Sequence, residues 1–168
     1  NLLLGQKQQA LMDQLITGGL SRNHHRKSVT VPWLADVPSH WSVLPVKRVL
    51  ASPITDGPHE TPEFVDAGVM FISAESIQNG EIDFNRRRGN ITMEANLVYS
   101  RKYSPITGDI YIVKSGATTG KSAMVRDFTD FNIWSPLAVL RPAKTISGDY
   151  LLLVVQSSPF QRAIALNW

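Results

Sequence analysis

The sequence predicts an α+β fold that is rich in strands, with an amphipathic helix end at the N-terminus and helices at the C-terminus. Short apolar runs alternate with turn-rich loops through the middle of the chain, which is typical of strands. The two ends of the chain carry helical patterns instead. The 168 residues, 43% of which are hydrophobic, provide enough material for one sizeable core.

The first segment, residues 1–19, has the pattern of a helix end. Three leucines fall on one helical face among Gln and Lys residues: Leu4, Leu11 and Leu15. The pair Gly18-Gly19 then supplies a C-terminal stop, because glycine readily adopts the left-handed conformation that ends many helices.

Residues 20–40 form a polar segment that is expected to be an extended connector. Pro32 and Pro38 exclude a continuous helix there, because proline lacks the backbone N–H that a helix interior needs. A globular domain is then expected to begin near Trp41 and to occupy residues 41–168.

The globular part is expected to combine strands with a few helices. Strands are predicted over five apolar runs, Val46–Ala51, Val69–Ser73, Asp109–Lys114, Ser122–Arg126 and Leu137–Arg141, which turn-rich loops such as TDGPHETP and SIQNGEID separate. A short helix is expected at Thr92–Leu97. The C-terminal stretch GDYLLLVVQSSPFQRAIAL also has a helical pattern, in which Pro159 either breaks the helix or starts a second one. Six residues are assigned to the core: Trp41, Phe64, Phe71, Tyr111, Trp134 and Leu137.

The composition excludes several classes of protein. The chain has no Cys, which rules out disulfides and thiolate metal sites, and none of its four His residues has the spacing of a metal site. No apolar run approaches the roughly 20 residues of a membrane span, and the N-terminal segment lacks the features of a signal peptide. We therefore expect a cytoplasmic protein that binds no metal. The missing initiator Met and the apolar C-terminal end indicate a fragment.

Charge is distributed unevenly along the chain, although the net charge is only +3. Residues 51–85 hold seven acidic residues and no Lys or Arg, whereas residues 86–126 hold eight basic residues and two acidic ones. This asymmetry suits a face that binds a polyanion, and a solvated basic face with salt-bridged neighbours is an equal alternative. Asp56, Glu60 and Glu63 lie in a Pro-rich turn region, where we interpret them as turn-capping residues rather than an acid–base cluster.

The stretch VKSGATTGKS, residues 113–122, is similar to a phosphate-binding P-loop but does not match it. The P-loop has four residues between its glycines, whereas three residues separate Gly116 from Gly120. The residues after Lys121 have the pattern of a strand, while a P-loop leads into a helix. We therefore predict a hairpin-like loop, and a nucleotide-binding phosphotransferase that uses Lys121 stays as an alternative. With no Asp/Glu-x-Lys nuclease signature and no G-x-S-x-G elbow, a binding module is favoured over an enzyme.

Three stretches, taken together and in order, resemble the target-recognition domain of the DNA specificity subunit of type I restriction-modification systems. They are TDGPHETPEFVDAGVMFISAESIQNGEIDF, GDIYIVKSGATTGKSAMV and FNIWSPLAVLRP. The segment QALMDQLITGGLSRN, followed by VPWLADVPSHWSVLPVKRV, is similar to the end of that family's spacer helix and the connector after it. A spacer-helix end before the domain implies the second recognition domain of a subunit. The family's P-L-P-x-x-E-Q-like segment before the distal helix is absent, so the domain is expected to be incomplete at its C-terminus.

The resemblance implies a non-catalytic module that reads one half of a bipartite DNA target. Its expected partners are double-stranded DNA and the modification (methyltransferase) and restriction subunits of the same system. The chain itself would hold no cofactor, since S-adenosylmethionine, ATP and Mg²⁺ are expected on the partner subunits. A scaffold that only docks partner helices is a further alternative.

The candidate site residues follow from this resemblance and from side-chain chemistry. Small hydroxyl residues and lysines on a glycine turn suit phosphate contacts, and arginine donors suit guanine edges or phosphates. The candidate DNA-binding residues are His59, Gln78, Arg86, Arg87, Arg88, Arg101, Lys102, Lys114, Ser115, Thr118, Thr119 and Lys121. The candidate partner-binding residues are Leu4, Leu11 and Leu15.

Overall fold

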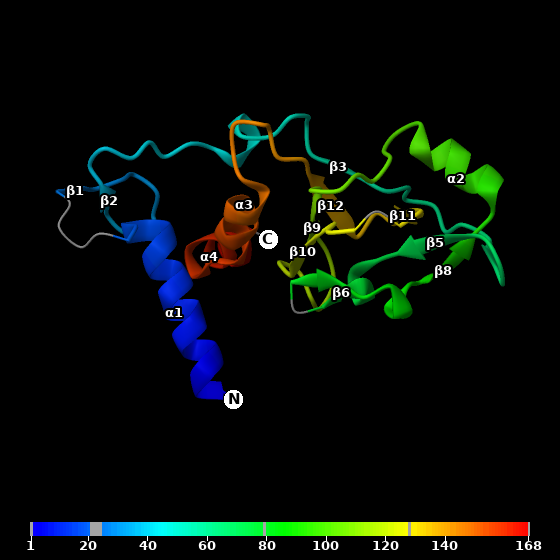
Figure 1. Ribbon diagram of the computed structural model, residues 1–168, viewed down its shortest axis with the longest axis horizontal. Coiled ribbons are helices and arrows are strands. Elements are labelled where there is room, and N and C mark those ends of the chain that lie inside the picture. Colours follow the sequence, from blue (N-terminus) through cyan, green and yellow to red (C-terminus); the bar gives the residue numbers. More distant parts are fainter. Residues whose placement is uncertain (1, 21–24, 79, 128, 168) are drawn as a thin grey trace. The chain divides into compact units, whose positions relative to one another are not determined.

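The structure, a computed structural model, describes residues 2–20, 25–78, 80–127 and 129–167. It confirms the α+β class, with an N-terminal helix, several small sheets and C-terminal helices (Figure 1). The chain divides into two compact units: unit 1 is Asn1–Pro45 with Asp149–Trp168, and unit 2 is Val46–Gly148. Among the described residues, no helix combines the length and the apolar composition that crossing a membrane requires.

Unit 1 begins with helix α1, Leu2–Gly18. The predicted glycine stop is confirmed, because Gly19 has a φ of 71° and its N–H donates to Leu15 O at 3.1 Å. The segment that was expected to be extended contains a short antiparallel pair of strands, β1 (Arg26–Lys27) and β2 (Val37–Pro38).

Two helices at the C-terminal end complete unit 1: α3 (Gly148–Gln156) and α4 (Ser158–Asn167). Pro159 thus starts a second helix, at a position where its missing N–H costs nothing. A carboxylate oxygen of Asp13 accepts a hydrogen bond from Ser158 N at 2.9 Å. A negative charge at the N-terminus of α4 complements the helix dipole, so Asp13 fixes α1 against α4.

Unit 2 contains two four-stranded sheets in its described part. One sheet has the order β10-β9-β12-β3 and is antiparallel; the other has the order β11-β5-β8-β4 and contains one parallel pair, β11 with β5. The strands are β3 (Thr55–Asp56), β4 (Phe64–Val65), β5 (Val69–Ile72), β8 (Gly89–Ile91), β9 (Ile110–Val113), β10 (Ser122–Met124), β11 (Phe131–Ile133) and β12 (Leu137–Leu140). Strands β6 (Ile77–Gln78) and β7 (Glu81–Ile82) form a separate pair, and helix α2 is Met93–Ser100.

The core of unit 2 forms around strand β9, whose four side chains are all buried. A strand that is covered on both faces is apolar throughout, which explains why IYIV shows no alternation. Phe71, Tyr111 and Leu137 are fully buried, as predicted. The prediction is wrong for Phe64, which is 39% exposed on β4, at one edge of its sheet.

Four of the five predicted strands are confirmed as β5, β9, β10 and β12, and the predicted short helix is confirmed as α2. The strand predicted at Val46–Ala51 is wrong. Residues Val46–Arg48 form a 3₁₀ turn, and Leu50 makes only an isolated antiparallel bridge with Pro142. The hydrogen bond from Val49 N to Val46 O, 2.9 Å long, belongs to a tight turn, whereas a strand would need an extended backbone at these residues.

The two ends of unit 2 lie side by side. Ala51 N donates to Arg141 O at 2.8 Å, and Ala143 N donates to Val49 O at 2.9 Å. These bonds flank the Leu50–Pro142 bridge, so the chain enters and leaves unit 2 through one pair of adjacent backbone segments.

Candidate functional site

The glycine loop joins β9 to β10, so the predicted hairpin is confirmed. Gly120 N donates to Val113 O, and Val113 N donates to Lys121 O, each at 2.8 Å. Gly116 and Gly120 have φ values of 96° and 91°, a region that favours glycine. Because Lys121 leads into β10, the segment lacks the strand–loop–helix geometry of a P-loop.

The hairpin carries five DNA-binding candidates on its loop, of which Lys114 also belongs to a second group. Ser115 and Lys121 are exposed, whereas Thr118 and Thr119 are half-buried. The Thr119 hydroxyl donates to Gly116 O at 2.7 Å, so it stabilises the turn itself.

Three candidates from separate parts of the chain, Lys114 among them, converge on one carboxylate. Lys102 Nζ donates to Asp56 Oδ1 at 2.5 Å, Lys114 Nζ donates to Asp56 Oδ2, and His59 Nε2 lies 3.1 Å from that same Oδ2. Lys102 Nζ also lies 3.3 Å from the carbonyl oxygen of Gly57. We call Asp56, His59, Lys102 and Lys114 the Asp56 cluster. The interpretation of Asp56 as a turn-capping residue missed these pairings.

The Asp56 cluster keeps an excess of positive charge. Burial raises the pKa of the Asp56 carboxyl, but hydrogen bonds and charge from Lys102 and Lys114 outweigh burial and lower that pKa to about 2. Two ammonium groups therefore face one carboxylate at neutral pH. The lysine side chains are 51% and 30% exposed, and each ammonium has three donors, so both can contact a second anion while they hold Asp56.

A small cavity of about 90 Å³ borders the Asp56 cluster. It is lined by Asp56, Gly57, Pro58, Val98, Tyr99, Lys102, Tyr103 and Asn132. Small-molecule sites usually enclose about 300–1,000 Å³, so this hollow suits a few water molecules rather than a substrate. A Cβ on Gly57 would lie 2.0 Å from Ile133 O, which shows how closely the chain packs beside the cluster.

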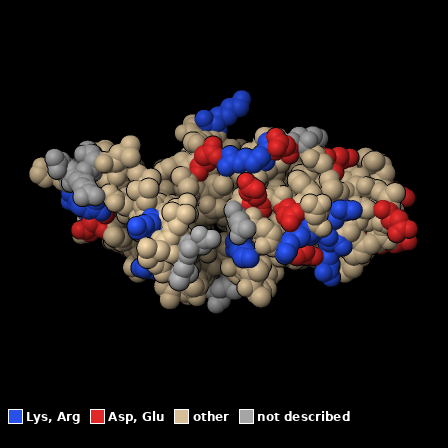
Figure 2. All heavy atoms as spheres, turned by 60° about the horizontal axis from the view of Figure 1, so that its bottom comes forward, with Lys and Arg blue, Asp and Glu red and all other residues tan. Residues whose placement is uncertain are grey.

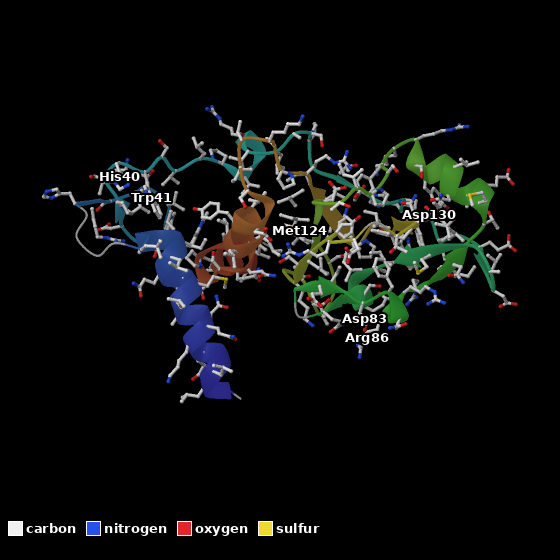
Figure 3. The ribbon with its side chains drawn as sticks, in the orientation of Figure 1. His40, Trp41, Asp83, Arg86, Met124 and Asp130 are labelled. Carbon is white, nitrogen blue, oxygen red and sulfur yellow. The ribbon has the colours of Figure 1, made fainter. Side chains whose placement is uncertain are left out.

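Acidic side chains partly neutralise the arginine triplet. Arg86 Nε lies 3.7 Å from an Asp83 carboxylate oxygen, and Arg88 lies 3.3 Å from Glu75 Oε1. Figure 3 shows Asp83 and Arg86 next to each other, and Figure 2 shows basic and acidic side chains intermixed on the face it presents. Exposed pairs of this kind contribute only about 0–1 kcal/mol, so an arginine can exchange such a partner for a phosphate at little cost.

Two arginines of the triplet have further contacts that orient their side chains. Arg87 Nε donates to Asn90 Oδ1 at 3.0 Å. The Arg88 guanidinium lies 5.3 Å from the centre of the Trp134 ring, a cation–π arrangement. The triplet is therefore not a freely moving basic stretch.

The remaining candidates belong neither to the hairpin loop, nor to the Asp56 cluster, nor to the arginine triplet. Gln78 is half-buried and donates to Glu75 O at 2.8 Å, and Arg101 is exposed at the C-terminal end of α2. On α1, Leu4 and Leu11 are 61% and 57% exposed, and Leu15 is half-buried.

A polar network that the sequence did not predict surrounds Asp109, which is fully buried. Its carboxylate accepts hydrogen bonds from Arg141 Nε at 2.7 Å, from Arg141 Nη2 at 2.8 Å and from the Tyr103 hydroxyl at 2.7 Å. The Tyr103 hydroxyl also lies 2.8 Å from that of Tyr111, and burial together with this neighbour raises the pKa of Tyr103. The network organises the core. No group of three or more potential metal ligands occurs among the described residues.

Neither a protein-family model nor a curated protein matches the sequence. A solved chain does match the structure; its study is described as "Structural basis underlying complex assembly and conformational transition of the type I R-M system". The TM-score is 0.50 at 18% sequence identity, and the match covers 92% of this chain and 35% of that chain. The protein therefore shares the fold of about one third of a chain from a type I restriction-modification complex.

Proposed function

We propose that this chain is a DNA-recognition module of a type I restriction-modification specificity subunit. It reads one half of a bipartite target and directs the modification and restriction subunits to it, without catalysis of its own. The observation that carries this proposal is the fold likeness over 92% of the chain to part of a type I complex. The three ordered stretches that resemble the family's target-recognition domain support it independently of the fold.

Two kinds of DNA contact are assigned to different residues. Lys102 and Lys114 of the Asp56 cluster, with Lys121 and the hydroxyl residues of the hairpin loop, contact phosphates and position the module. Base edges are read by the arginines of the triplet, because a bidentate guanidinium matches guanine O6 and N7, and by His59 and Gln78. Arg101 adds a further donor at the end of α2.

The N-terminal helix serves assembly in this proposal. The exposed leucines of α1, Leu4 and Leu11, continue with Leu15 along a stripe that packs on a helix of a partner subunit. Residues 1–19 are then the end of a spacer helix, residues 20–40 a connector and residues 41–168 the recognition domain. S-adenosylmethionine, ATP and Mg²⁺ belong to the partner subunits, and the complex acts in the cytoplasm.

The exposed leucines also favour a second candidate function, a scaffold that only docks helices. The two functions differ in their salt dependence. A DNA-recognition module that neutralises phosphates loses affinity steeply as salt rises, by about 0.9 log units per tenfold change in salt for each contact. A docking scaffold shows no such DNA binding.

Substitutions of basic residues, made in the chain assembled with its partner subunits, test the proposal; the target sequence is first identified by mapping the methylated sites in cells that carry the intact system. Lys114→Ala combined with Lys121→Ala should weaken binding equally for this target and for unrelated duplexes, and make the salt slope shallower by roughly 0.9 per lost contact. Lys144→Ala, an exposed lysine outside the candidate set, is the matched control and should leave the slope unchanged.

The arginine triplet is tested one residue at a time. Loss of a base-reading bidentate contact should relax preference at a single base position by about 1–3 kcal/mol. If all three arginine variants keep the ratio of target to random binding, the triplet only grips phosphates. If the wild-type chain binds duplex DNA without salt dependence, the proposed function itself is refuted.

A further inference from the structure

We propose that Asp56 restrains sequence-independent DNA binding, as a specificity-determining residue that holds two phosphate-contacting lysines and limits their charge. This inference rests on the proposed DNA-recognition function. It adds an acidic residue to an interface that the sequence suggests is built from basic and neutral residues only.

The backbone, rather than a mobile loop, fixes the position of the Asp56 carboxylate. Asp56 is the last residue of β3 and pairs with Ala138 of β12. The next residue, Gly57, packs so closely on Ile133 that it has no room for a side chain. The carboxylate is therefore a rigid acceptor between Lys102 and Lys114, which lie 46 and 58 residues further along the chain.

The number of cations around Asp56 exceeds what its own neutralisation needs. A single lysine would balance the carboxylate, yet two lysines donate to it, and the side chain of Asp56 is only 17% exposed. The side chains of Lys102 and Lys114 remain 51% and 30% exposed, and Lys102 also lines the 90 Å³ cavity. The two lysines and the Asp56 carboxylate together thus carry a net charge of +1, because the carboxylate neutralises one of the two ammonium groups.

Cancelling one cation has a specific effect on DNA binding. Every uncancelled lysine near a phosphate releases a counterion and strengthens binding to any sequence. Holding the lysines on a rigid carboxylate also fixes where a phosphate must sit, so only a correctly placed duplex satisfies both ammonium groups. Asp56 thereby weakens random binding more than it weakens target binding.

The substitution Asp56→Asn tests this inference, because it keeps the side-chain size and removes the charge. The probe is a labelled duplex of random sequence, titrated over about 0.05–0.2 M salt. At roughly 0.1 M salt, one additional phosphate contact corresponds to about an eightfold gain in affinity, with a salt slope steeper by about 0.9. Asp83→Asn is the matched control: it removes the same charge, but the pair of Asp83 with Arg86 is exposed and 3.7 Å long, so Arg86 is already available to a phosphate and the affinity should change much less.

A second variant covers the case in which Asp56→Asn fails to fold. Lys102→Gln leaves Lys114 to neutralise Asp56, so the carboxylate stays paired, and random binding should weaken about eightfold with a shallower slope. The inference is overturned if Asp56→Asn binds random duplex no more tightly than Asp83→Asn, or if Lys102→Gln leaves the slope unchanged. In either case the proposed function would still hold if the wild-type chain binds DNA in a salt-dependent way. If the wild-type chain shows no such binding, the proposed function itself is refuted.

Discussion

Removing Arg141 should destabilise unit 2 more than removing any surface cation. Arg141→Ala takes away the two hydrogen bonds that its guanidinium donates to Asp109, a residue with no exposed surface. The carboxylate would keep only the Tyr103 hydroxyl and the N–H of Ile106 as donors. A charge that stays buried after it loses its partner costs about 3–5 kcal/mol.

The expected loss lies at the lower end of that range. The Arg141 side chain is 29% exposed, so water can reach the position it vacates, and two of the donors to Asp109 remain. We expect the free energy of unfolding at pH 7 to fall by about 3 kcal/mol, which corresponds to a Tm decrease of roughly 12–24 °C for a domain of this size. Urea denaturation followed by circular dichroism measures this change.

Two companion variants separate charge from geometry. Arg141→Lys keeps the charge but loses the two-pronged contact, so it should cost about 1–2 kcal/mol. The double variant Asp109→Asn with Arg141→Met leaves no buried charge and should be more stable than Arg141→Ala alone. An Arg141→Ala protein within 1 kcal/mol of wild type, or a double variant less stable than the single one, would refute this reasoning.

Two other predictions concern packing and acid stability. Gly57→Ala should lower the free energy of unfolding by about 2 kcal/mol or more, since its Cβ would lie 2.0 Å from Ile133 O. Gly5→Ala in α1, where a Cβ meets nothing within 4 Å, should instead raise helix stability by about 0.5–1 kcal/mol. Thermal denaturation of the two variants and the wild type measures both changes. The folded-state pKa of Asp56, about 2, lies below the ordinary 3.8, so its ionised carboxylate contributes about 1–2 kcal/mol above pH 4 that is lost as pH falls to 2. Asp56→Asn should flatten the stability profile in that window, and an unchanged profile would contradict the assignment.

The correctly predicted strands were predicted from apolar runs of five or six residues. The runs that became β5, β9, β10 and β12 lie in or next to the core, so their side chains had to be apolar whatever their partners were. Strands β3, β4, β6, β7, β8 and β11 were not predicted, because two or three residues are too few to show a period; β10 is equally short but lies within the longer predicted run Ser122–Arg126. The strand predicted at Val46–Ala51 does not form, because an apolar run becomes a strand only when it pairs with a neighbour along its length. Here only Leu50 makes a bridge, with Pro142.

The sequence suggests the residue types of a candidate site but not how the fold groups them. A basic segment after an acidic one is visible in the sequence, and the pairs Arg86–Asp83 and Arg88–Glu75 show that the two segments neutralise each other in part. That Asp56 lies between Lys102 and Lys114 could not be foreseen, because an ion pair between residues so far apart leaves no local pattern. The buried Asp109 network was invisible for the same reason.

The adjacent ends of unit 2 have a consequence for how such a protein can change over generations. The bonds between Ala51 and Arg141 and between Ala143 and Val49 bring the two chain crossings together, with the rest of unit 1 outside them. A segment whose ends meet in this way can be replaced by recombination at two points without altering the flanking helices. Exchange of residues 46–148 as a block would then leave the flanking residues of unit 1 unchanged.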